Sequence, residues 1–152
     1  MSLDAASILD AVVSHAAASG HFERVNGFEP TNAPGNGLTA AVWVQEIGPV
    51  RSGSGLASTT GRLVLNLRIY ASAEQDPPDA IDPAMLTAVD ALMAAYSGDF
   101  ELGGNVRNVD LLGQAGVPLS AQAGYLPLDG ATYRVYTLTI PLIVNDLWTQ
   151  SP

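Results

Sequence analysis

The residues that could support chemistry are few, and their spacing does not suit it. His15 and His21 are the only two histidines of the chain and stand six residues apart across a predicted helix end. Side chains share a helix face when about three or four residues separate them, so this pair is not expected to hold a metal ion. The sequence places no acid where it would evidently orient either imidazole, and it contains no cysteine. We therefore expect histidines at the surface or at a helix cap, with no catalytic, metal or cofactor site.

Two further segments have compositions that ligand-binding loops share. Asp76, Asp79 and Asp82 alternate with prolines, but no glycine pivot or closing glutamate completes a calcium loop. The glycine and serine run at residues 52–55 is of the kind whose backbone amides hold phosphate. The lysine of a P-loop is missing, however, and the run leads into a strand rather than a helix. Since no Gly-x-Ser-x-Gly elbow leads from a strand into a helix either, the sequence favours a protein that is not an enzyme.

Charge and composition narrow the class of partner. The 152 residues include 15 acids and 6 basic residues, which gives a formal net charge of −9. Because sequence-independent binding to a phosphate backbone depends on clustered basic side chains, DNA binding is not expected. All six basic residues are arginines, the cation best suited to bidentate pairing at interfaces. No apolar run approaches the roughly 18 residues that cross a bilayer, and we expect one domain over residues 1–152 without an export signal.

Alternation of apolar and polar residues predicts the strands. Residues 62–73 have the period-two pattern of a strand with one buried face and are predicted to form the central strand. The run that closes the chain, residues 136–144, has the same property, and an Asp129-Gly130 turn predicts a hairpin over residues 125–144. The remaining predicted strands are residues 38–47, residues 106–112 and a short extended piece at residues 22–25.

Three- and four-residue spacing of apolar side chains predicts two helices. The first covers residues 3–19, with Ser2 as N-cap and Gly20 as its end. The second begins with Asp82 as N-cap and Pro83 at the first helical position, and Gly98 ends it. We expect an α+β fold: a mixed, mainly antiparallel sheet of about four to five strands with two helices packed on it.

Two segments with little regular pattern are candidates for a functional role. Residues 48–61, which we call the arm, carry Gly, Ser or Thr at nine of fourteen positions. A connection this long between antiparallel neighbours is usually functional or disordered. Residues 145–152 are predicted to form a polar tail whose one large apolar side chain is Trp148. Trp148 is expected either to pack at an edge or to anchor in a neighbouring subunit, since aromatic side chains are enriched at contact hot spots.

The order of these elements resembles that of the tail-terminator proteins of long-tailed bacteriophages, the group typified by the lambda U protein. The segments that carry the resemblance are the strand RLVLNLRIYA, the helix IDPAMLTAVDALMAAYSG and the closing run YRVYTLTIPLIVNDLW. The resemblance covers nearly the whole chain and rests on hydrophobicity and element length. Related neck proteins, namely tail-completion and head-tail connector proteins, share the layout and remain the alternative. A small ligand-binding module and a small hydrolase are the alternatives of a different class.

The resemblance implies a structural virion protein of the tail or neck, assembled in the host bacterial cytoplasm. It implies a homo-hexameric ring on the end of the tail tube that stops tube polymerisation and meets a head-tail connector or stopper protein. DNA would pass through the ring without specific binding, because an acidic wall repels it. Each subunit of such a ring presents two different patches, and a strand edge is a ready place for one.

The resemblance also suggests where contacts lie in this chain. The arm matches the position of a long loop that the family directs at the tube or channel, so tube contact is expected at Arg51, Ser52, Gly53, Ser54 and Gly55. Contacts between subunits are expected at Arg68, Arg107, Arg134 and Trp148.

Overall fold

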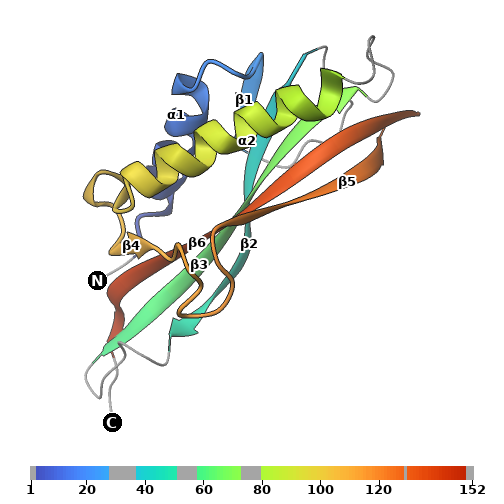
Figure 1. Ribbon diagram of the computed structural model, residues 1–152. Coiled ribbons are helices and arrows are strands. Elements are labelled where there is room, and N and C mark those ends of the chain that lie inside the picture. Colours follow the sequence, from blue (N-terminus) through green and yellow to red (C-terminus); the bar gives the residue numbers. More distant parts are fainter. Residues whose placement is uncertain (1–2, 28–36, 51–57, 73–79, 129, 150–152) are drawn as a thin grey trace.

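A six-stranded sheet carries both helices on one face in the computed structural model (Figure 1). The structure describes residues 3–27, 37–50, 58–72, 80–128 and 130–149. In chain order the elements are α1 (Ala5–Ala18), β1 (Arg24–Asn26), β2 (Thr39–Val50), β3 (Ser58–Ser72), α2 (Ile81–Gly98), the short 3-10 helix η2 (Leu102–Gly104), β4 (Asn108–Val109), β5 (Ser120–Leu128) and β6 (Ala131–Thr149).

The sheet has the order β1-β2-β3-β6-β4, and β5 pairs with β6 along the same edge as β4. Only β1 and β2 run parallel among the described strands. This confirms the α+β class and the mainly antiparallel sheet. The sheet has one strand more than the upper end of our expectation, because the short extended piece near residue 24 pairs with β2.

The two longest strands, β3 and β6, lie side by side at the centre of the sheet. Their register runs from Ser58 opposite Thr149 to Ser72 opposite Tyr133. The predicted polar tail is therefore wrong for residues 145–149, which belong to β6. The cause is the length of β3, whose first residues supply backbone partners that the polar composition of this segment does not reveal. The predicted hairpin is confirmed by the register of Leu128 opposite Ala131, although β5 begins at Ser120, before the predicted start at residue 125.

Both helix starts differ from the prediction. Asp4 rather than Ser2 caps α1, because its Oδ1 accepts the Ser7 N–H at 3.2 Å and its Oδ2 accepts the Ser7 hydroxyl at 2.8 Å. The N-cap of α2 is Ala80, which has no side-chain cap bond, so Asp82 lies inside the first turn. Asp82 instead pairs with an arginine of β6.

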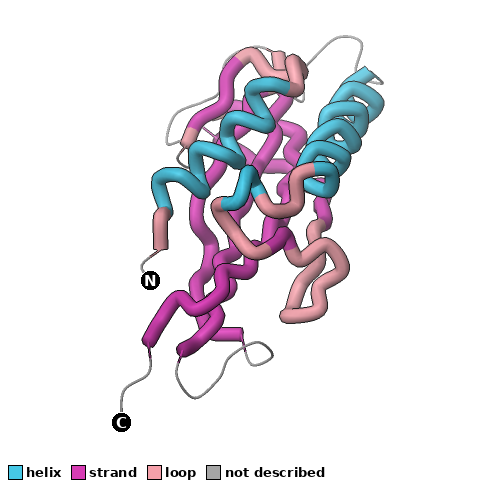
Figure 2. The backbone as a smooth tube through the Cα atoms, turned by 90° about the vertical axis from the view of Figure 1, so that its left-hand side faces the viewer, coloured by secondary structure: helices cyan, strands magenta, loops and turns pink. Residues whose placement is uncertain are grey.

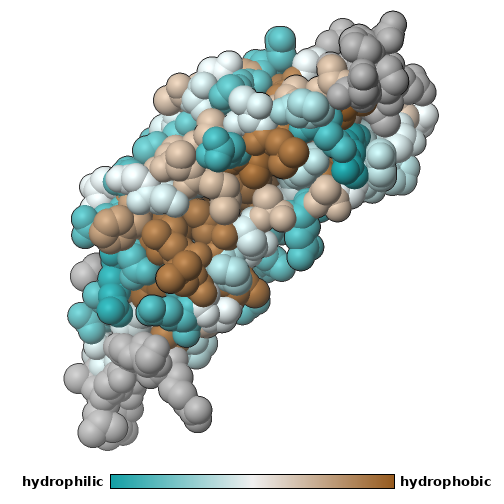
Figure 3. All heavy atoms as spheres, in the orientation of Figure 1, coloured by the Kyte–Doolittle hydropathy of each residue, from teal (hydrophilic) through white to brown (hydrophobic). Residues whose placement is uncertain are grey.

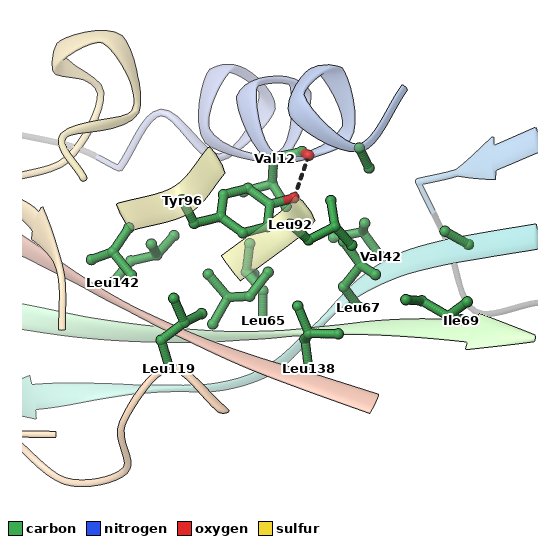
Figure 4. Close-up of a cluster of buried hydrophobic side chains, with 14 of the residues drawn as sticks. Val12, Val42, Leu65, Leu67, Ile69, Leu92, Tyr96, Leu119, Leu138 and Leu142 are labelled. Atoms are coloured by element: carbon green, nitrogen blue, oxygen red, sulfur yellow. Dashed lines mark hydrogen bonds between the residues drawn. The ribbon is translucent and has the colours of Figure 1, made fainter. Parts of the chain in front are cut away.

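The main core lies between the helices and the sheet (Figure 4). It is formed by apolar side chains that alternate along β3 and β6 and recur at helical spacing in α1 and α2. Tyr96 of α2 is fully buried there, and its hydroxyl donates to the Val12 carbonyl of α1 at 2.8 Å. Burial raises the pKa of the Tyr96 hydroxyl. This side chain thus fills the core and also joins the two helices. No helix in the described ranges is long and apolar enough to span a membrane.

Replacing Tyr96 with Phe should lower the free energy of unfolding by about 1 kcal/mol, the usual net contribution of one hydrogen bond. Urea unfolding followed by circular dichroism measures the change. Tyr125→Phe is the matched control, because Tyr125 is 68% exposed and should change stability by less than about 0.5 kcal/mol. Equal effects of the two substitutions would contradict a structural role for the Tyr96 hydroxyl.

Candidate functional site

Three strands continue past the helix layer and form a projecting end of the molecule (Figures 1 and 2). We call this end, residues 46–50, 58–62 and 144–149, the strand tip. Pairing continues to Val50 opposite Thr60, so both ends of the predicted arm are strand. The prediction of an irregular connection is therefore wrong for residues 48–50 and 58–61, because backbone pairing extends into both ends of the arm. The tube-contact prediction at Arg51, Ser52, Gly53, Ser54 and Gly55 lies outside the described residues.

Trp148 belongs to the strand tip and not to a free tail. It lies opposite Thr59 and is 39% exposed. A Cβ atom at Gly61 would come within 2.5 Å of Leu147 Cδ2 and 3.4 Å of Trp148 Cη2, so the side chains of Leu147 and Trp148 lie close over this glycine of β3. Trp148 thus packs on its own sheet and presents the remainder of its ring to the outside. Its role as an anchor between subunits stays a prediction.

The face of the sheet away from the helices contains a polar hollow of about 370 Å³. We call this hollow the trough. Strand register sets its floor, since Asn66 lies opposite Thr139 and Arg68 lies opposite Thr137 on the central strands. Its rims come from β2 and β5. The polar lining consists of amides, hydroxyls and one cation, contributed by Gln45, Asn66, Arg68, Gln122, Thr137 and Thr139.

Arg68 is fixed in this trough by two contacts with neighbouring strands. Its Nε donates to Thr137 Oγ1 at 2.9 Å, and its Cζ lies 5.2 Å from the centre of the Trp43 ring. In the described part of the chain no carboxylate oxygen lies within ion-pair distance of Arg68. The guanidinium is therefore held in place without an acid partner.

Arg134, by contrast, has an acid partner in its own chain. Its Nε donates to Asp82 Oδ1 at 2.9 Å, and the Tyr136 hydroxyl donates to the same oxygen at 3.2 Å. The Arg134 guanidinium also lies 4.6 Å from the centre of the Tyr125 ring. The hydrogen bond from Arg134 lowers the pKa of Asp82. This cluster fastens the start of α2 to β6.

The other two arginines near the tip differ in exposure. Arg107 is exposed and reaches Asn145 Oδ1 at 3.4 Å. Arg62 pairs with Glu46 at 3.1 Å, and a Cβ at Gly116 would come within 2.9 Å of its guanidinium carbon. The loop that carries Gly116 is held by buried Asp110, whose carboxylate accepts two backbone N–H groups. Arg62 is thereby covered, whereas Arg107 is available for contact.

The structure also joins a pair that the sequence did not indicate. His15 Nε2 and Asp99 Oδ2 lie 2.8 Å apart, and the His15 ring meets the Tyr96 ring edge-on at 5.7 Å. The Gly103 N–H and then His15 lower the pKa of Asp99. Our expectation that no acid orients either histidine is thus wrong for His15, because 84 residues separate it from Asp99. The described residues contain no group of three or more metal-ligating side chains.

Apolar side chains form a further exposed surface beside β4. Leu112 is 83% exposed and Phe100 is 47% exposed, and both line an open hollow with Leu111. Figure 3 shows apolar patches among polar side chains on the side of the molecule seen in Figure 1. Exposed apolar surface of this kind commonly marks contact with another protein.

The pair of Asp82 and Arg134 predicts a pH dependence of stability. A carboxylate whose folded-state pKa is lowered stabilises the fold above its ordinary pKa of 3.8, and the stabilisation is lost as the pH falls through the lowered value. The urea midpoint of the wild type should therefore fall further between about pH 6 and about pH 3 than that of Asp82→Asn. Glu101→Gln, at an exposed acid outside this cluster, should retain the wild-type dependence. Identical pH profiles for all three proteins would contradict the prediction.

Comparisons with known proteins leave the family of this chain open. No family model matches it, and no curated protein matches it. Among solved structures, the chain is similar to a chain described as the sheath/tube terminator of an extracellular contractile injection system, PVC, in the extended state. The two chains are 14% identical and superpose with a TM-score of 0.37. The match covers 99% of this chain and only 60% of that chain, and a likeness at this level shows neither family nor function.

Proposed function

We propose that this chain is a tail-terminator protein that forms a hexameric ring at the end of a phage tail tube. In this role it stops tube polymerisation and joins the tail to the head connector or stopper protein. The protein acts as a structural subunit of the virion neck, is assembled in the host cytoplasm and performs no catalysis. Six acidic copies around a channel suit the passage of DNA without specific binding, since the wall repels the phosphates.

The observation that carries the proposal is the placement of the elements. The resemblance to tail terminators rests on the order of a helix, a long strand, the arm, a second long strand, another helix, a further strand and a closing hairpin. The described strands form one sheet with both helices on one face, and the end of β2 and the start of β3 lie in the projecting strand tip. A projecting tip at one end of a subunit is suited to contact a tube while the remaining surface contacts neighbouring subunits.

The proposal assigns roles to particular residues. Arg51, Ser52, Gly53, Ser54 and Gly55 contact the tube. Arg68, Arg107, Arg134 and Trp148 lie at subunit contacts, where Arg134 acts as one member of its cluster with Asp82.

Strand edges are less suited to subunit contact than the resemblance suggested. Among the described residues, β2 has no partner on its outer edge beyond β1, and it contains a bulge between Val44 and Glu46 and also Pro49. The edge strand β5 contains Pro127. Bulges and prolines are features by which proteins prevent pairing at sheet edges. We therefore assign the subunit contact to faces of the molecule rather than to added strands.

Mass determination in solution, with and without added tail tube protein, tests the proposal. We expect ring oligomers, or a monomer that forms rings only on tube ends, together with tubes of limited length in negative-stain images. Replacing residues 51–57 with Asn-Gly leaves a four-residue connection between the paired Val50 and Thr60, a length that hairpins accommodate. This variant should lose tube binding and keep the fold intact. Arg24→Ala is the control outside the tip and should bind as the wild type does. A stable monomer that ignores tube ends would refute the assignment.

A further inference from the structure

We propose that the trough is a carboxylate-binding socket, and that its occupant is an acidic side chain on the helix layer of a second copy of this chain. The inference rests on the proposed ring, because it describes how one subunit contacts the next. It selects Arg68 from the arginines of the chain as the residue that receives the acid.

The first argument is the state of the Arg68 guanidinium. Its Nε donates a hydrogen bond to Thr137, and its flat face lies over the ring of Trp43. No described residue occupies the two terminal nitrogens, which form the parallel pair of donors that binds a carboxylate in bidentate fashion. A guanidinium that neighbouring strands already hold loses little further freedom on binding, so this site is preorganised for an anion.

The second argument is the composition of the trough. Its described lining residues include no acid, although the chain as a whole carries 15 acids against 6 basic residues. Gln45, Asn66 and Gln122 add amide groups that donate hydrogen bonds around the cation. A carboxylate that enters the trough therefore meets donors on several sides and no like charge from the lining.

The third argument concerns the occupant. Neither α1 nor α2 contains an arginine or lysine, whereas each exposes an acid on its outer side, Asp10 and Asp90. The helix layer and the trough lie on opposite faces of the sheet, so a helix layer placed on the next copy's trough makes a head-to-tail contact. Such a contact uses two different patches of one chain and closes into a ring when the rotation allows. Charge complementarity between these two faces favours a second copy over other partners.

Paired charge variants of the full chain test the inference. Arg68→Glu sets carboxylate against carboxylate, and the double variant Asp10→Arg with Asp90→Arg sets guanidinium against guanidinium. Sedimentation, with and without tube protein, should show association weakened by about 30-fold or more for each variant alone. An equal mixture of the two should reassociate, because in an alternating ring every contact joins either a native pair or a charge-swapped pair. That recovery would also show that both variants are folded.

Arg24→Glu is the matched control, because it makes the same charge change at an exposed arginine of β1. It should associate as the wild type does. Wild-type association of Arg68→Glu would overturn the inference, and so would a mixture that fails to reassociate. A ring on tube ends that is insensitive to Arg68 would overturn the inference and leave the proposed function standing. Association that depends on Arg68 but occurs without tube binding would support the inference and refute the proposed function. A wild type that never associates would overturn both.

Discussion

The antiparallel pairing of β3 with β6 is the constraint on which the rest of the structure depends. It joins segments that are far apart in the chain, since Ser58 and Asp146 form a hydrogen bond across 88 residues. Closing such a loop costs entropy, and burial of the alternating apolar side chains of both strands offsets that cost. The same register sets Arg68 beside Thr137 and Trp148 beside Thr59. The trough and the strand tip are thus two consequences of one pairing.

The two faces of the sheet differ in composition and in role. One face carries the main core and is closed by helices that Tyr96 and the pair of His15 and Asp99 tie together. The other face holds a smaller apolar cluster built on Tyr70, Tyr133 and Val135, and polar groups line the trough beside it. Stability therefore comes mainly from the helix-bearing face, while the opposite face leaves polar side chains free to make contacts.

Local sequence patterns were a good guide to element type and a poor guide to element ends. Alternation identified the central strand and the closing strand, because a half-buried strand requires it wherever it lies. The ends of β3 and β6 lie instead in glycine-rich and polar sequence, where the only cause of strand is a partner from a distant segment. The predicted cap of α2 was wrong for a related reason, since the partner of Asp82 is an arginine of β6 that is 52 residues away in the chain.

The sequence by itself determined the α+β class, the two helices, the turn of the last hairpin and the acidic charge, because composition and periodicity act over a few neighbouring residues. Only the tertiary structure decided that Arg134 has an acid partner within the chain, that His15 meets Asp99, and that Arg68 lies in a trough whose described lining contains no acid. These side chains are 52, 84 and 69 residues from the groups they contact. No local pattern specifies such a meeting, since it follows from which strands pair and which faces the helices cover.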